Sequence, residues 1–203
     1  MCIRDSHLTG LLEVLKRYRV ERILASPVSS DLPVFKEWLQ VAKSKNVEYI
    51  TAQTGQQIML NSGAILDILN PPWVPDSDAD TDENAIVTRL SYGNHSILFT
   101  SDIGYTAETR IMRERLVRDS EILKIGHHGS NNSTSAGFLK VVKPFVAIIS
   151  AGQDNQFGHP AKATLDRISA SGIKNIFRTD MNGTITLLID ANDPGIRVKT
   201  ERK

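Results

Sequence analysis

Three short apolar runs in this 203-residue chain each lead to a polar turn that carries histidine or aspartate. The runs and their side chains are Ile97–Thr100 with Asp102, Ile122–Ile125 with His127 and His128, and Phe145–Ser150 with His159. Short runs rich in β-branched residues predict buried strands, and the glycines and prolines after them predict turns. Because ligands of open α/β sheets gather at the carboxyl ends of the strands, we expect these four side chains at one sheet edge.

Strands and helices alternate through most of the sequence. Helical periodicity begins near Leu11 and recurs at about residues 32–45, 106–117, 135–142 and 161–171. Predicted strands lie at 20–25, 47–53, 57–60, 64–69, 85–92, 96–100, 122–125, 145–150, 173–177 and 184–189, and short Gly/Asn turns indicate hairpins within 57–69 and 85–100. The pattern predicts an α/β fold in which a mostly parallel sheet is extended by antiparallel strands.

Length and composition limit the class of protein. At 203 residues and 40% hydrophobic content, the chain is expected to bury one α/β core. The net charge of +1 gives no global field that would recruit nucleic acid or an anionic membrane. The single cysteine, Cys2, excludes an intrachain disulfide and a cysteine-based zinc site. No apolar run reaches the length of a membrane span, so we expect this chain by itself to be soluble.

Alternating aspartates at 76, 78 and 80 follow the spacing of a calcium loop, but two required residues are missing. Thr81 stands where that loop needs glycine, and Val87 stands where it needs glutamate. We therefore predict a solvated acidic loop.

Several polar residues have simple structural interpretations. His95, beside the Gly93-Asn94 turn, is interpreted as an exposed turn residue. Asp102, considered alone, is more often the cap of the helix that follows it. That helix alternates arginines with Glu108 and other acids, which is typical of a solvated face.

Three histidines and one aspartate at equivalent strand ends favour a shared metal site over separate structural roles. Neutral imidazole and carboxylate are ligands that Zn²⁺ and Mn²⁺ accept without a thiol, and an aspartate can bridge two ions. Two cations suit the hydrolysis of a phosphodiester, because they generate hydroxide near neutral pH and stabilise both the attacking and the leaving oxygen. One of the paired histidines is then a ligand and the other a second-layer residue or proton donor.

Four segments resemble the metallo-β-lactamase-like domain of ComEC-type DNA-internalisation competence proteins: Leu98–Ile103, Leu123–Ser130, Ile148–Pro160 and Arg178–Ile185. The likeness runs from about His7 to Ile189. It implies an αββα sandwich, a dinuclear Zn²⁺ or Mn²⁺ centre and a role in DNA uptake. In that family the domain accompanies a membrane channel in the same polypeptide and is proposed to degrade the strand that is not imported. The resemblance therefore implies a parent protein in the bacterial cytoplasmic membrane, with this domain on its outer face.

The resemblance also assigns residues. His7 matches the last histidine of the first family motif, His-x-Asp-x-Asp-His, but Ser6 replaces its aspartate and the earlier ligands have no match. We therefore expect a sandwich incomplete at its N-terminal side, with residues 1–6 as a non-native or disordered leader, 7–190 as the domain and 191–203 as a C-terminal strand or tail. Asp102 matches the bridging aspartate and His159 the last metal histidine. The middle histidine has no counterpart. The resemblance implies two ions in an intact family member, whereas this chain is expected to hold one or none.

The leading hypothesis is a metal-dependent DNA nuclease domain, impaired in this fragment, that acts on single-stranded DNA. The predicted metal ligands are His7, Asp102, His127, His128 and His159; Asp102, His127 and His128 are also predicted catalytic residues, and Ser130 and Asn155 are predicted to bind substrate. Which of the paired histidines faces the metal is left open. The alternatives are a stand-alone hydrolase of a small ester or phosphoester, and a non-catalytic DNA-binding or assembly module.

Overall fold

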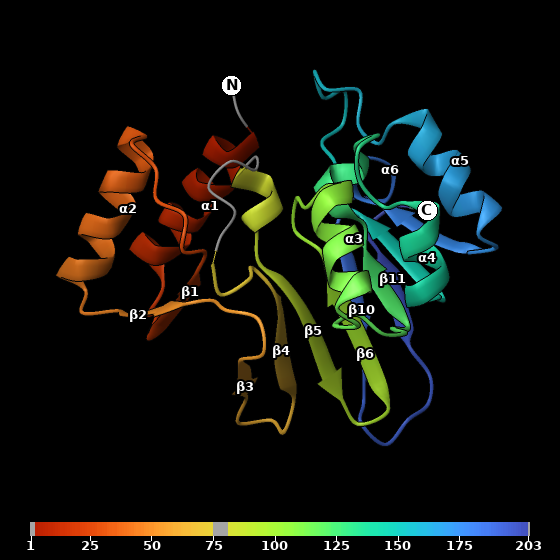
Figure 1. The fold of residues 1–203 in the computed structure, drawn as a ribbon, viewed down its shortest axis with the longest axis horizontal. Helices are drawn as coiled ribbons and strands as arrows, with labels where there is room; N and C mark the ends of the chain where they lie inside the picture. Colours follow the sequence, from red (N-terminus) through yellow and green to blue (C-terminus); the bar gives the residue numbers. More distant parts are fainter. Residues whose placement is uncertain (1–2, 75–80, 203) are drawn as a thin grey trace. The chain divides into compact units, whose positions relative to one another are not determined.

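The computed structural model describes residues 3–74 and 81–202 of the chain (Figure 1). It divides into two compact units, Met1–Ala52 and Gln53–Lys203. The predicted domain boundaries at 7 and 190 stay a prediction. Residues 75–80, which hold most of the predicted acidic loop, lie outside the described residues. In the described part of the chain, no helix is both long enough and apolar enough to cross a lipid bilayer.

The first unit is a β-α-β arrangement preceded by a helix. Its elements are α1 (Ile3–Arg17), β1 (Arg22–Ala25), α2 (Pro33–Ser44) and β2 (Glu48–Thr51), with β1 and β2 parallel. Pro33 suits the first helical position, because its fixed φ is helical and its missing N–H would have no helical partner there. Leu12 and Leu15 of α1 pack with Trp38 and Ala42 of α2 in a small core. Residues 3–6 are helical, whereas residues 1 and 2 lie outside the description, so the predicted leader stays a prediction.

The second unit contains a seven-stranded mixed sheet in the order β3-β4-β5-β6-β7-β8-β9. The strands are β3 (Gln57–Met59), β4 (Ile65–Asn70), β5 (Val87–Tyr92), β6 (His95–Phe99), β7 (Ile122–Lys124), β8 (Val146–Ile149) and β9 (Asn175–Arg178). Pairing is antiparallel from β3 to β6 and parallel from β6 to β9. This arrangement confirms the predicted α/β class with antiparallel strands joined to a parallel part.

The sheet is covered on both faces. The helices of this unit are α3 (Tyr105–Arg113), α4 (Ala136–Val142), α5 (Lys162–Ala170) and the short α6 (Thr179–Asn182), with one-turn 3-10 helices η1 (Thr81–Asn84) and η2 (Gly126–Gly129). Ile111, Phe138 and Ile168 of the three longer helices pack on Leu98 and Leu123 of the sheet.

The other face carries a separate antiparallel hairpin, β10 (Ile185–Leu188) and β11 (Arg197–Thr200). Ile97 and Ile122 of the sheet pack there with Leu187 and Ile189, since successive side chains of a strand point to opposite faces. Each fully buried side chain of this size contributes about 1.5–3 kcal/mol to folding. The two apolar layers thereby fix the sheet and leave its strand ends for polar turns.

Glu83, rather than Asp102, caps helix α3. The Glu83 Oε2 atom accepts a hydrogen bond from the backbone N–H of Ala107 at 2.7 Å, and the N-cap residue is Gly104. A Cβ atom on Gly104 would lie 2.6 Å from Glu83 Oε1, so only glycine lets the carboxylate approach. The interpretation of Asp102 as a helix cap is therefore wrong, and its carboxylate needs another explanation.

Candidate metal centre

The turns that carry the predicted ligands follow neighbouring parallel strands. Ile97 of β6 pairs with Ile122 of β7, which pairs with Val146 of β8. Because the three strands run in the same direction, their carboxyl ends meet at one edge of the sheet. Asp102, the His127-His128 pair and the turn leading to His159 all emerge at this edge, as the sequence predicted.

His127 and His128 occupy a strained turn. Both have left-handed backbone conformations, with φ of 48° and 54°, which cost about 1–2 kcal/mol for each non-glycine residue. The His127 N–H donates to the carbonyl of Ser101 at 2.9 Å, and the Ser130 N–H donates to the carbonyl of His127 at 2.8 Å. Strain of this kind persists where the surroundings over-determine the backbone, and it gathers at functional sites.

The segment after the histidine pair is held by two charged side chains from neighbouring helices. Glu108 of α3 accepts hydrogen bonds from the backbone N–H groups of Thr134 and Ser135. Arg167 of α5 donates to the carbonyls of Ser133 and Thr134 at 2.9 and 3.2 Å. Glu108 is only 2% exposed and its burial raises the pKa of the carboxyl. The prediction that it belongs to a solvated face is therefore wrong.

The histidine-pair turn and the His159 turn are locked together. Gly129 has a φ of +81°, and a Cβ atom there would lie 2.6 Å from the Cβ atom of Pro160. The Ala161 N–H donates to the carbonyl of Gly129 at 2.9 Å. Glycine at 129 therefore allows the ring of Pro160 to approach, and the two turns keep a fixed relation.

His128 and Asp102 present ligand atoms to each other. His128 Nδ1 lies 2.7 Å from the carbonyl oxygen of Ser150, which can only accept, so this nitrogen carries the hydrogen. The other ring nitrogen, Nε2, lies 3.6 Å from Oδ1 of Asp102, which is 6% exposed. Two ligand atoms of a tetrahedral zinc ion are separated by about 3.3 Å. The spacing therefore fits a shared cation, and the Ser150 contact is the usual way to orient such a ligand.

His159 supplies a third imidazole at this edge. Its Nδ1 atom is buried and has no hydrogen-bond partner among the described residues. Its ring centroid lies 6.1 Å from that of His127. Burial, followed by His127 and His128, lowers the pKa of His159, although Asp102 acts in the opposite direction. A neutral imidazole with an unsatisfied buried nitrogen fits a metal ligand, because an unpaired polar atom otherwise costs about 1–3 kcal/mol.

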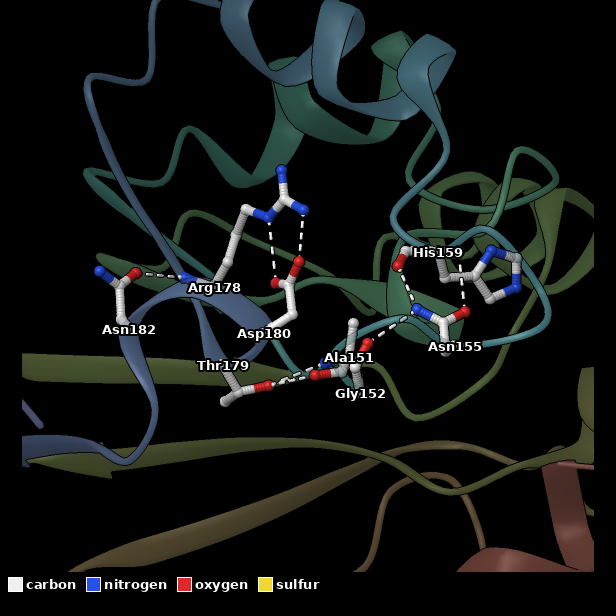
Figure 2. Close-up of polar contacts among 8 residues, drawn as sticks. All are labelled: Ala151, Gly152, Asn155, His159, Arg178, Thr179, Asp180 and Asn182. Carbon is white, nitrogen blue, oxygen red and sulfur yellow. Dashed lines mark hydrogen bonds and ion pairs between the residues drawn. The ribbon is translucent and has the colours of Figure 1, made fainter. Parts of the chain in front are cut away.

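Asn155 organises the turn that carries His159 (Figure 2). Its Oδ1 atom accepts hydrogen bonds from the N–H groups of Phe157 and His159 at 3.2 and 3.0 Å. Its Nδ2 atom donates to the carbonyls of Gly152 and His159 at 2.9 and 2.6 Å. The amide thus uses both its oxygen and its nitrogen inside the turn, although the sequence had suggested a substrate-binding role.

Thr179 ties the same turn to the next strand. Its Oγ1 atom accepts from the N–H of Ala151 at 2.9 Å and donates to the carbonyl of Ala151 at 2.8 Å (Figure 2). Beside it, the Arg178 guanidinium and the Asp180 carboxylate form a bidentate ion pair. The carboxyl ends of β8 and β9 are therefore joined through one hydroxyl group.

Four of the predicted site residues, Asp102, His127, His128 and His159, emerge together at this edge of the second unit. Ser130 follows the pair after Gly129, and its Oγ atom accepts a hydrogen bond from the N–H of Asn132 at 3.4 Å. His7 lies in α1 of the first unit, so its role as a ligand stays a prediction. The positioning residues Glu108, Arg167 and Thr179 were missed, because hydrogen bonds between residues about 30 apart leave no local pattern.

Comparison with curated proteins gives clear relatives. The chain is 30% identical over 181 residues to ComE operon protein 3 of Bacillus subtilis strain 168, covering 89% of this chain and 23% of that protein. It is 35% identical over 116 residues to competence protein ComA of Neisseria gonorrhoeae, covering 55% of this chain and 16% of that protein. The chain thus spans less than a quarter of the length of either relative. No family model matches the sequence.

The fold also has a counterpart among solved structures. A variant of the β-hydroxylase CmlA is similar over 80% of this chain and 38% of that chain, with a TM-score of 0.51 and 14% identity. At this level of identity the likeness concerns the fold alone. Together with the mixed sheet and its helices, it shows that the chain has the metallo-β-lactamase fold, as the resemblance implied.

Proposed function

Because this chain is a homologue of the ComEC-type competence proteins, we propose that it is their metal-dependent phosphodiester hydrolase part and acts on DNA during uptake. The observation that carries the proposal is the pairing of Asp102 Oδ1 with His128 Nε2 at 3.6 Å, while His128 Nδ1 is held by Ser150. Two ligand atoms from different strand ends face each other, and the second nitrogen of the imidazole is already oriented.

In this proposal Asp102, His128 and His159 hold a divalent cation, Zn²⁺ or Mn²⁺. The geometry supports His128 as the member of the pair that binds the metal. His7 is a further proposed ligand on the strength of the family motif alone. When bound, such a cation supplies Lewis acidity for a phosphate and activates water near neutral pH.

His127 is proposed to act on the substrate rather than the metal. A protonated imidazole can donate a proton to a leaving oxygen, and the strained turn fixes the backbone of His127. Ser130, one turn further on, is proposed to bind a substrate oxygen through its hydroxyl. The amide of Asn155, by contrast, is engaged with the backbone of its turn, so we propose that it positions His159 instead of binding substrate.

Single-stranded DNA is the proposed substrate, and a membrane channel in the same polypeptide is the proposed partner. The support is the name of one relative, competence protein ComA, and the length of both relatives, since this chain matches less than a quarter of each. We further propose that the parent protein lies in the bacterial cytoplasmic membrane, with this part on the outer face.

The test is cleavage of labelled single-stranded DNA with added Mn²⁺ or Zn²⁺. We expect at most weak cation-dependent cleavage, which is lost in Asp102→Asn and His128→Gln and kept in a His95→Gln control, because His95 lies at the opposite end of β6. The same assay is run on a version with Cys2→His, Arg4→Asp and Ser6→Asp, which places His-x-Asp-x-Asp before His7. If both versions bind the cation and neither cleaves DNA, the proposal fails.

A further inference from the structure

The turn between β8 and α5 presents an aromatic side chain that the proposed chemistry does not use. Phe157 is 47% exposed, and its ring stacks on that of His159 with centroids 6.0 Å apart and an interplanar angle of 21°. A phenylalanine in this position forgoes much of the stabilisation that burial would give it. A single exposed apolar residue is common on protein surfaces, so the case depends on how the ring is held.

The backbone around this ring is fixed from within the turn. Asn155 Oδ1 accepts hydrogen bonds from the N–H groups of both Phe157 and His159, and Asn155 Nδ2 binds the carbonyl of His159 (Figure 2). One amide therefore holds the backbone of both Phe157 and His159, while the stacking on His159 orients the ring of Phe157. Thr179 ties the start of the same turn to the end of β9 through Ala151. A ring held in this way loses little further conformational freedom when a ligand packs against it.

We propose that Phe157 is a nucleobase-binding residue, which stacks on one unpaired base of a DNA strand whose phosphate lies at the proposed metal centre. This inference rests on the proposed function and adds to it a residue that selects the substrate. Aromatic rings bind bases by stacking, with little regard for sequence, because every base has a π face. A base inside a duplex has both faces covered by its neighbours, so Phe157 favours single-stranded DNA or a frayed end.

The experiment measures binding of a fluorescent oligothymidine and a matched blunt duplex by anisotropy. The oligonucleotides carry phosphorothioate linkages, which resist hydrolysis, so that binding to the native chain and its Phe157 variants is measured with the cation present and without cleavage. Phe157→Ala is expected to raise the Kd for the single strand by roughly 5- to 140-fold, the range for one stacked base. Phe157→Trp keeps the affinity, whereas Phe157→Leu, which is apolar but has no π face, loses it. The Kd for the duplex changes by less than about twofold.

A matched control is Phe145→Ala. Phe145 is 66% exposed and directly precedes β8, so it lies at the opposite end of the strand that leads to the Phe157 turn. We expect it to leave the Kd for both oligonucleotides unchanged. Binding of Zn²⁺ by the Phe157 variants in the otherwise native chain serves as a second control, because a ring that only supports His159 would weaken metal binding in step with DNA binding.

The outcomes separate this inference from the hydrolase proposal. Cleavage by the native chain together with unaltered single-strand binding in Phe157→Ala overturns the stacking role and leaves the hydrolase standing. Single-strand binding that depends on the aromatic ring, in a chain that never cleaves, supports stacking and removes the hydrolase. Three other results also overturn the stacking role. Phe157→Ala could lose the same affinity for the single strand and the duplex, or Phe157→Leu could bind as tightly as Phe157→Trp. The chain with Phe157 intact could also fail to bind DNA.

Discussion

Histidines near the two ends of strand β6 have opposite surroundings. At its start, His95 is buried, and both ring nitrogens face acceptors: Nδ1 lies 3.0 Å from Oε2 of Glu121, and Nε2 lies 2.7 Å from the carbonyl of Asp193. Asp102 follows the other end of β6, and its Oδ1 atom faces Nε2 of His128, which follows the neighbouring strand β7. Nearby, His159 Nδ1 is buried with no hydrogen-bond partner among the described residues. A histidine with hydrogen-bond acceptors at both ring nitrogens supports the fold. A ring nitrogen that faces a carboxylate, or that is buried without a hydrogen-bond partner among the described residues, fits the proposed role of metal ligand.

The interpretation of His95 as an exposed turn residue is wrong for the same reason. The ring is 3% exposed, and one of its acceptors, Asp193, lies 98 residues further along the chain. Two facing acceptors favour the imidazolium form. The hydrogen bond to Asp193 and then the contact with Glu121 raise the pKa of His95, while burial lowers it.

The largest expected effect is on metal affinity. Removing the charge at Asp102 with Asp102→Asn is expected to weaken Zn²⁺ binding by at least about 100-fold, because loss even of a supporting contact to a ligand costs about 10–100-fold. Isothermal titration calorimetry measures this. His95→Gln is the control and keeps the native affinity. Equal Zn²⁺ affinities for Asp102→Asn and the native chain would contradict a metal centre at the carboxyl end of β6.

For the free energy of unfolding, we expect a substitution at His95 to cost more than one at the proposed metal centre. His95→Gln is expected to lower the free energy of unfolding by about 2 kcal/mol, since hydrogen bonds to charged groups are each worth about 1.5–3 kcal/mol. His128→Gln in the metal-free chain is expected to cost less than about 1 kcal/mol, because His128 faces a carboxylate from a strained backbone. Urea unfolding compares the two, and a larger loss in His128→Gln would break the contrast.

A smaller effect is expected at the hydroxyl that joins β8 and β9. Thr179→Val keeps the shape of the side chain but removes both hydrogen bonds to Ala151, at a cost of about 1–2 kcal/mol in unfolding free energy. Thr179→Ser keeps the hydroxyl and is the matched control. If the two variants unfold at the same urea concentration, Thr179 does not hold the turn through its hydroxyl.

The smallest expected effect is the pH dependence due to His95. Because the pKa of His95 is raised in the folded chain above its ordinary value of 6.5, its contribution to stability is complete below that value. The contribution is lost as the pH rises through the folded pKa. Urea unfolding of the native chain and of His95→Gln is measured as the pH rises from below 6.5. The stability difference between them is expected to shrink, because the variant has no His95 contribution to lose. A native chain that gains stability relative to the variant as the pH rises would contradict it.

The position of the candidate site at the strand ends could be predicted from the sequence. The hydrogen bonds from distant residues that hold the site could not. Apolar runs before Asp102, His128 and His159 are local signals, and parallel pairing brings their ends together, so the edge of the sheet followed from the sequence. The burial of His95 and Glu108 depends on partners 26 or more residues away, which no local pattern shows. The choice of His128 over His127 as the proposed ligand also needed the contact with Ser150. Division into two units was likewise invisible, because helix and strand alternate across residue 52.

The most direct test of the proposed metal centre is to follow the ring nitrogens of all five histidines by ¹⁵N NMR while Zn²⁺ is added. We predict that the signals of His128 Nε2 and of one nitrogen of His159 move to metal-bound positions. His128 Nδ1 stays protonated against Ser150, and both nitrogens of His95 keep their shifts. Ring signals of His128 and His159 that do not change at saturating Zn²⁺, or a change at His95 instead, would contradict a metal centre at the carboxyl ends of β6, β7 and β8.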